Sequence, residues 1–304
     1  NSKRDFKRPI TIEELALDIG PELGKSAVAG KVDGVLVDAS QIISKDCKVS
    51  ILTADDKEGL EVIRHSCAHL LAHALKQLYP QVKLAIGPVI EDGFYYDILL
   101  DKTLSDKDLK KIENQMQKLA KKKYKVVREE VKKKKAIDVF ESRSEPYKVK
   151  IAKEIPNNEV IALYHHEEYI DMCRGPHVTN TRHLKTFKLT KISGAYWKGD
   201  SKNEMLQRVY GTAWKNKKDL DNYLQVQEEA EKRDHRKLGR NLDLFHFQEE
   251  APGMPFWHPK GKTIFTEIER YLREQQISRG YQEIQTPSIL DISLWERSGH
   301  TEKF

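Results

Sequence analysis

The chain has 304 residues, of which 33% are charged and 38% hydrophobic, with a formal net charge of +6. The length exceeds what one ordinary core holds and predicts two or three domains, and the composition excludes a disordered chain. No apolar run reaches the roughly 18 residues of a membrane span, and no signal peptide opens the chain. Its three cysteines, Cys47, Cys67 and Cys173, are an odd number without framework spacing. They favour reduced thiols in a cytoplasmic protein.

The excess positive charge is clustered in two lysine runs. One is Lys121 to Lys125, interrupted by Tyr124, and the other is Lys132 to Lys135. Clustered lysines raise the local potential and favour a polyanion such as nucleic acid. The alternative is an ordinary solvated helix face.

Residues 1–56 read as a small α/β module, of a size that is typical of a binding or regulatory appendage. A helix is expected at Glu13–Ile19, closed by Gly20-Pro21. Asp33-Gly34 between β-branched residues predicts a hairpin turn, and Val49 to Leu52 a last short strand.

Residues 57–215 read as a second unit that opens on a long helix. In Glu61–Leu78 the apolar residues recur at helical spacing, which places His65 and His69 on one face. A second helix is capped by Ser105, with Asp108 completing a capping box. The other expected elements are strands at Leu84–Val89, Gly93–Asp97 and Lys125–Val131, a helix near Ile137–Arg143, a loop at Glu145–Lys148, paired strands at Val160–Tyr164 and Glu168–Met172, and an antiparallel sheet completed by Phe187–Ser193, Gly194–Trp197 and Leu206–Tyr210.

The remaining residues begin with a highly charged helix from Lys218 to about Lys237, which predicts a connection between domains. A new unit then starts, with a helix at Thr263–Ile277 and a strand at Gln282–Gln285 ahead of Pro287.

Two short motifs concentrate chemically active side chains. The first is His65-Ser66-Cys67-Ala68-His69, and the second is Cys173-Arg174-Gly175-Pro176-His177, which must be a tight loop or helix start. Three imidazoles and one thiol converge only if the fold brings the loop over the helix. Such a set could hold a metal, or position water and a nucleic-acid 3′ end for hydrolysis. The alternative is that each pair of residues is incidental.

Together with other segments, these motifs make the chain resemble the bacterial-type threonyl-tRNA synthetases. The resemblance runs in order along practically the whole chain. It rests on Ile63–Leu71, Tyr169–His177, Arg208–Trp214, Lys232–Lys237 and Glu249–Met254.

The resemblance implies a multidomain α+β fold of four parts. These are a ubiquitin-like TGS module at 1–56, an editing domain at 57–215, a linker helix at 216–240 and the start of a class II aminoacylation domain at 241–304. Gly280, Tyr281 and Pro287 resemble the first motif of that class. The family's first TGS strand would precede Asn1, so we expect an unpaired sheet edge and fast hydrogen exchange at Arg8–Ile12. The rest of the aminoacylation site and the anticodon-binding domain would follow Phe304.

The resemblance also implies site residues. His65, His69, Cys173 and His177 form the editing centre, which hydrolyses serine wrongly attached to tRNA(Thr) by means of a positioned water. Asp171 would suit the substrate's α-ammonium, and Lys148 the terminal ribose oxygens or the water. Tyr96 would line the pocket, and Arg174 would bind substrate. Lys148 could instead be an ordinary surface lysine, and Asp171 could simply cap the Cys173 turn. His73, His165 and His166 are assigned structural roles.

Several alternatives stay open at this point. Cys173 could be a covalent nucleophile with an imidazole as base. The three histidines and the cysteine could hold zinc, as is plausible for the similar alanyl-type editing domains, although no tightly bound metal is expected here. A non-catalytic tRNA-binding or zinc-stabilised module is the alternative from another class. By resemblance, ATP, magnesium and zinc belong to the aminoacylation site, and the partners of the whole protein are tRNA(Thr) and a second copy of itself, with no membrane.

Overall fold

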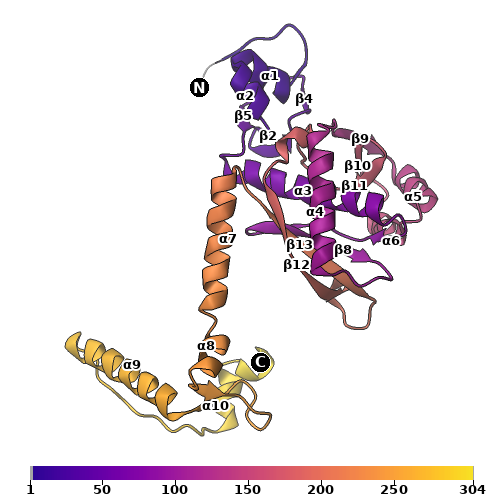
Figure 1. Cartoon of the computed structure of the whole chain (residues 1–304). Helices are drawn as coiled ribbons and strands as arrows, with labels where there is room; N and C mark the ends of the chain where they lie inside the picture. The colour runs from indigo at the N-terminus through magenta and orange to yellow at the C-terminus, as the bar shows by residue number, and fades with distance from the viewer. Residues whose placement is uncertain (1–2, 304) are drawn as a thin grey trace. The chain divides into compact units, whose positions relative to one another are not determined.

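The computed structural model describes residues 3–303 and divides into two compact units, Asn1–Leu224 and Gln225–Phe304. Both units mix helices and strands, which confirms the α+β expectation (Figure 1). The outermost residues of the first and last predicted modules, Asn1, Ser2 and Phe304, lie outside the described part. Among residues 3–303, no helix is long and apolar enough to cross a membrane.

The described residues up to position 56, here called the N-terminal module, form one small sheet and a strand pair. The predicted hairpin forms at Asp33-Gly34, where both residues have positive φ as an Asp-Gly turn of this kind requires. The expected unpaired edge at Arg8–Ile12 is wrong in part, because Ile10 pairs with Ile43 and is buried. The strand order is β3-β2-β5, with β1 beside β4. The elements are β1 Ile10–Thr11, α1 Ile12–Ile19, α2 Pro21–Ser26, β2 Ala29–Val32, β3 Val35–Asp38, β4 Ile42–Ile43 and β5 Val49–Leu52.

The second module, residues 57–215, is built on an antiparallel sheet of order β12-β13-β8-β6, with β7 paired to β8. Helices α3 and α4 pack together and against this sheet (Figure 1). Their apolar stripes and the inward face of the sheet form the main core. The predicted strand at Leu84–Val89 is split in two. The elements are α3 Lys57–Leu78, β6 Lys83–Leu84, β7 Val89–Ile90, β8 Gly93–Leu99, α4 Asp106–Lys121, β12 Phe187–Tyr196 and β13 Met205–Ala213, with short 3₁₀ turns at Thr181–His183 and Trp197–Gly199.

A second sheet of this module, of order β11-β10-β9, was not distinguished from the first in the sequence. Helices α5 and α6 pack together, and with this sheet they form a separate small core. The predicted loop at Glu145–Lys148 is wrong, because Pro146 starts helix α6 rather than ending a segment. Proline is favoured at the first helical position, where no backbone donor is needed. The elements are β9 Val127–Val131, α5 Lys133–Ser142, α6 Pro146–Glu154, β10 Ile161–His166 and β11 Tyr169–Met172.

The first two modules share one continuous core. Val28, Ala29 and Leu52 of the N-terminal module lie in the same buried cluster as Val62 and Ile63 of α3. The joint is closely packed, since a Cβ on Gly59 would stand 1.8 Å from the Thr53 carbonyl oxygen. Only residues 53–56 separate β5 from α3, and the Asp56 carboxylate accepts from the Thr53 amide at 2.7 Å. The N-terminal module is therefore packed onto the second module rather than tethered to it.

The predicted connecting helix is interrupted. It consists of α7 Lys217–Lys232 and α8 His235–Asn241, because the Asp234 carboxylate accepts from the Arg236 amide and starts a new helix. The boundary between the two compact units falls within α7.

The second unit continues with a two-stranded sheet and a long helix. The predicted strand at Gln282–Gln285 is wrong, since Ile284 is 81% exposed and a strand needs a hydrogen-bonded neighbour, which the described residues do not provide. The elements are β14 Phe245–His246, β15 Phe256–Trp257, α9 Pro259–Ser278, α10 Ile292–Arg297 and α11 His300–Lys303.

Candidate active site

Helix α3 supplies the first two histidines. Its 22 residues have few exposed positions, so the face that carries the histidines is packed rather than solvated. The His65 side chain is half-buried and that of His69 is buried, and their ring centroids lie 5.5 Å apart.

The loop after β11 supplies the other two side chains. Strands β10 and β11 pair antiparallel, which carries the chain back to α3 and places Cys173 Sγ 3.0 Å from His65 Nε2. The His177 ring lies 4.3 Å from that of His65 and 4.0 Å from that of His69, between centroids. The metal-binding atoms of His65, His69, Cys173 and His177 all lie within 4.8 Å of one another. The structure thus brings both motifs together into one group, here called the His/Cys cluster.

Ser66 fixes the orientation of the His177 ring, a function that the sequence reasoning missed although Ser66 lies inside the first motif. Its hydroxyl lies 2.8 Å from the Val62 carbonyl, accepts from the Val178 amide and lies 3.1 Å from His177 Nδ1. A hydroxyl has one proton. Because the Ser66 hydroxyl donates its proton to the Val62 carbonyl, His177 Nδ1 must be the donor to Ser66. The lone pair of His177 is then on Nε2.

A buried ion pair lies beside the cluster. The Lys148 ammonium of α6 contacts the Asp171 carboxylate of β11, and both residues are almost completely buried. Asp171 also accepts from the hydroxyls of Tyr96 at 2.6 Å and Tyr169 at 2.8 Å, and its Oδ2 lies 3.6 Å from His69 Nε2. Burial raises the pKa of Asp171, but Lys148 and the two hydroxyls lower it to a net value below the ordinary one.

Lys148 is therefore not an ordinary surface lysine, and Asp171 does more than cap the turn at Cys173. The amide of Met172 is one of four donors to Asp171, the others being Lys148, Tyr96 and Tyr169. Tyr96 is fully buried in β8 and also accepts from Lys148 at 2.9 Å.

The cluster is electrically neutral near pH 7. Burial lowers the pKa of His65, and it lowers those of His69 and His177 well below the ordinary value. Burial raises the pKa of Cys173 to about 11. The thiol therefore keeps its proton, which disfavours the nucleophilic alternative because the thiolate is the attacking species.

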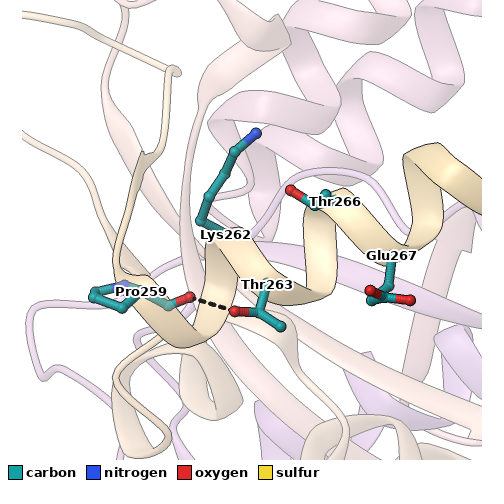
Figure 2. Close-up of a pocket in the computed structure, with 5 residues that line it drawn as sticks. All are labelled: Pro259, Lys262, Thr263, Thr266 and Glu267. Atoms are coloured by element: carbon teal, nitrogen blue, oxygen red, sulfur yellow. Dashed lines mark hydrogen bonds between the residues drawn. The ribbon is translucent and has the colours of Figure 1, made fainter.

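The open side of the cluster is formed by its half-buried members, His65 and Cys173, with the exposed Arg174 next in the loop. Two surface hollows lie elsewhere. One, of about 310 Å³, lies along the first turns of α9, where the Thr263 hydroxyl donates to the Pro259 carbonyl (Figure 2). The other, of about 640 Å³, is lined by Lys132 to Lys134 and by Asn157 and Asn158 among others. Neither is lined by a residue of the His/Cys cluster.

The His/Cys cluster fits zinc in ligand type. Zinc takes imidazole nitrogen and cysteine sulfur in tetrahedral sets. Two buried ring nitrogens, His69 Nδ1 and His177 Nε2, have no hydrogen-bond partner among the described residues. His65, His69, Cys173 and His177 would hold the ion, which would polarise a bound water.

The three histidines that were assigned structural roles differ in their surroundings. His73 is buried and its Nε2 lies 2.8 Å from a Glu168 oxygen, whereas His165 is partly exposed and lies 3.1 Å from Glu129. His166 is fully buried, 6.3 Å from His69 between ring centroids, and neither ring nitrogen has a partner in the described part of the chain.

Comparison with known proteins agrees with this architecture. Residues 1–53 match the TGS domain model, and residues 161–210 match the model described as the threonyl and alanyl tRNA synthetase second additional domain. The second match includes Asp171, Cys173, Arg174 and His177. The chain thus matches a TGS domain followed by an additional domain of the threonyl and alanyl tRNA synthetase type.

A threonine–tRNA ligase is among the relatives of the chain. The chain is 58% identical over 303 residues to that of Prochlorococcus marinus (strain MIT 9211), which is 100% of this chain and 48% of the relative. The resemblance that the motifs indicated is confirmed, and the chain spans about half the length of the curated relative that it matches.

Proposed function

We propose that this chain hydrolyses the ester between serine and tRNA(Thr), as the editing part of a threonine–tRNA ligase. The single observation that carries the proposal is the His/Cys cluster, in which two motifs far apart in the sequence meet. The whole protein would charge tRNA with threonine in an ATP-dependent reaction. The module boundaries at 56, 215 and 240 belong to the same proposal.

Threonine and serine differ by one methyl group, which explains why such a site is needed. A pocket gains only about 1–3 kcal/mol from one methylene, a discrimination of roughly 10- to 200-fold. A second site that admits serine and excludes the threonine methyl hydrolyses the wrong product, which is the double-sieve arrangement.

The residues divide the chemistry in the following way. The ester would enter at the open side of the cluster, between His65 and Cys173, with Arg174 near the incoming nucleic acid. Neutral imidazoles offer lone pairs, so His65 and His177 can accept a proton from a positioned water. His69 lies on the buried side of the cluster, with its Nε2 3.6 Å from Asp171 Oδ2.

Lys148 supplies the nearby positive charge that steadies developing negative charge on the ester oxygens. Asp171 and Tyr96 hold this ammonium in place. This reverses part of the sequence expectation, since the four donors on Asp171 leave it better suited to anchor Lys148 than to bind the substrate's ammonium.

A second candidate is favoured by the ligand set, namely a zinc-stabilised tRNA-binding module without catalysis. Because the donors fit zinc, metal content and hydrolysis must be measured together.

The test is single-turnover deacylation of seryl-tRNA(Thr) and threonyl-tRNA(Thr) by the purified chain, with and without a chelator. We expect seryl-tRNA to be hydrolysed at least about tenfold faster, since one methyl group decides entry. Chelation is expected to leave the rate unchanged. Tight tRNA binding without hydrolysis would favour the second candidate, and loss of the rate on chelation with recovery on added zinc would make the metal part of the site.

The lysine runs are expected to contribute affinity without reading the amino acid. Lys132, Lys133 and Lys134 line the 640 Å³ hollow. Because the Lys133 ammonium already donates to two backbone carbonyls, Lys132 and Lys134 are the two that we expect to meet phosphate. Replacing both with alanine should weaken tRNA binding and lower the slope of log affinity against log salt by about 1 to 2.

The control is Lys198→Ala, since Lys198 is paired with Glu154 at 2.5 Å on the same unit. Serine preference in single-turnover deacylation should be intact in both variants. A changed preference in the Lys132/Lys134 variant would mean that these lysines act on the reacting end of the tRNA.

A further inference from the structure

A carboxylate of the N-terminal module reaches the His/Cys cluster. Asp38 ends strand β3, and its side chain is 11% exposed. Its Oδ1 accepts from the His177 amide at 2.8 Å, and its Oδ2 accepts from the Tyr164 hydroxyl at 2.9 Å. The Asp38 side chain thus binds both the His177 amide of the second motif and the Tyr164 hydroxyl of β10.

Tyr164 extends this contact to the rest of the loop. Its ring lies 4.4 Å from the His177 ring, edge to face, between centroids. Its hydroxyl lies where a side chain on Gly175 would have to go, 2.0 Å from the position of a Cβ. Gly175 has φ of +71°, so this position favours glycine on both counts. Asp38 and Tyr164 therefore support the loop between Cys173 and His177 at two points.

The hydrogen bond from the His177 amide to Asp38 is directional as well as short. A backbone amide that donates to a carboxylate makes a charge-assisted hydrogen bond, which is stronger than a neutral one. The amide belongs to His177 itself, so a shift of this bond moves the Cα of a cluster residue. Ser66 holds the His177 ring at Nδ1, and Asp38 holds the backbone of the same residue, which is the second fixed point.

We propose that Asp38 is a positioning residue for His177, so that the N-terminal module forms part of the hydrolytic site rather than a separate appendage. The proposal rests on the proposed function and goes beyond it, because it assigns a residue outside the second module to the reaction. Arg128 of β9 also supports the carboxylate, with its Nε 3.6 Å from Asp38 Oδ2.

The test compares Asp38→Ala, Asp38→Asn and Glu13→Ala in the whole chain. Glu13 is the matched control, since it lies on α1 and also contacts the second module, with its Oε1 3.5 Å from Arg182 Nη2. For Asp38→Ala we expect kcat for seryl-tRNA hydrolysis to fall about 10- to 100-fold with KM within about twofold, the range seen when a supporting hydrogen bond is removed. Asn keeps an oxygen for the His177 amide, so Asp38→Asn should lose only about three- to tenfold. Glu13→Ala should match the parent.

Hydrogen exchange of the His177 amide separates this proposal from the proposed function. Exchange should accelerate by about tenfold or more in Asp38→Ala, less in Asp38→Asn, and not at all in Glu13→Ala. If the parent does not hydrolyse seryl-tRNA, the proposed function fails while the exchange result still decides the positioning. If Asp38→Ala does not fold, the isosteric Asp38→Asn decides. Parental kcat and parental exchange in Asp38→Asn, or an equal loss in Glu13→Ala, would overturn the assignment.

Discussion

Replacing His65 or Cys173 with alanine is expected to abolish most seryl-tRNA hydrolysis while tRNA binding is kept. These two residues form the open side of the cluster, and Cys173 Sγ lies 3.0 Å from His65 Nε2. Loss of His65, a group that moves protons, costs about 10²- to 10⁴-fold in rate, and loss of Cys173 removes the side chain in contact with that imidazole. The measurement is single-turnover deacylation beside a filter-binding affinity for uncharged tRNA.

His165→Ala is the matched control, since its imidazole is only partly exposed and lies 3.1 Å from Glu129 rather than in the cluster. It should hydrolyse seryl-tRNA at the parental rate. Parental rates in His65→Ala and Cys173→Ala would remove the basis for a hydrolytic site. A loss of binding in step with activity would instead make the cluster a docking surface.

Acidification is expected to destabilise the folded chain through its buried histidines, and His166 offers the clearest measurement. Burial lowers its pKa to about 3, whereas an unfolded histidine titrates near 6.5. Between these values the unfolded chain binds a proton that the native chain does not. The free energy of unfolding therefore falls as the pH drops below about 6.5, and it is restored above that pH.

By pH 5 this single group lowers the free energy of unfolding by about 2 kcal/mol. His166→Phe removes the titration and gives up no hydrogen bond among the described residues, because neither ring nitrogen has a partner. Urea unfolding at pH 7.5 and pH 5 should show a loss about 2 kcal/mol smaller in His166→Phe than in the parent. Equal losses in the two proteins would show that His166 is protonated in the native chain.

The helix and hairpin that frame the site could be predicted because their signals are local. The spacing of apolar residues in Glu61–Leu78 places the helix, and Asp33-Gly34 fixes the turn, since only a few residue types tolerate positive φ there. Pro146 was misread because proline both ends segments and starts helices, and only the following residues decide between the two.

The site itself could be predicted only as two halves. The i, i+4 spacing puts His65 and His69 on one face, but the return path of β10 and β11 that delivers Cys173 depends on pairing between strands. The contact of Asp38 with His177 joins residues that no periodicity relates. Contacts between distant segments come from packing, and a single sequence contains no local pattern for them.

The close joint between β5 and α3 has a mechanical consequence. Gly59 has no room for even a methyl group against Thr53, and the Asp56 carboxylate locks the few residues that precede the helix. A displacement of the small N-terminal sheet is therefore expected to move α3, the helix that carries His65. A molecule that binds to that sheet would therefore act on the helix that carries two imidazoles of the His/Cys cluster.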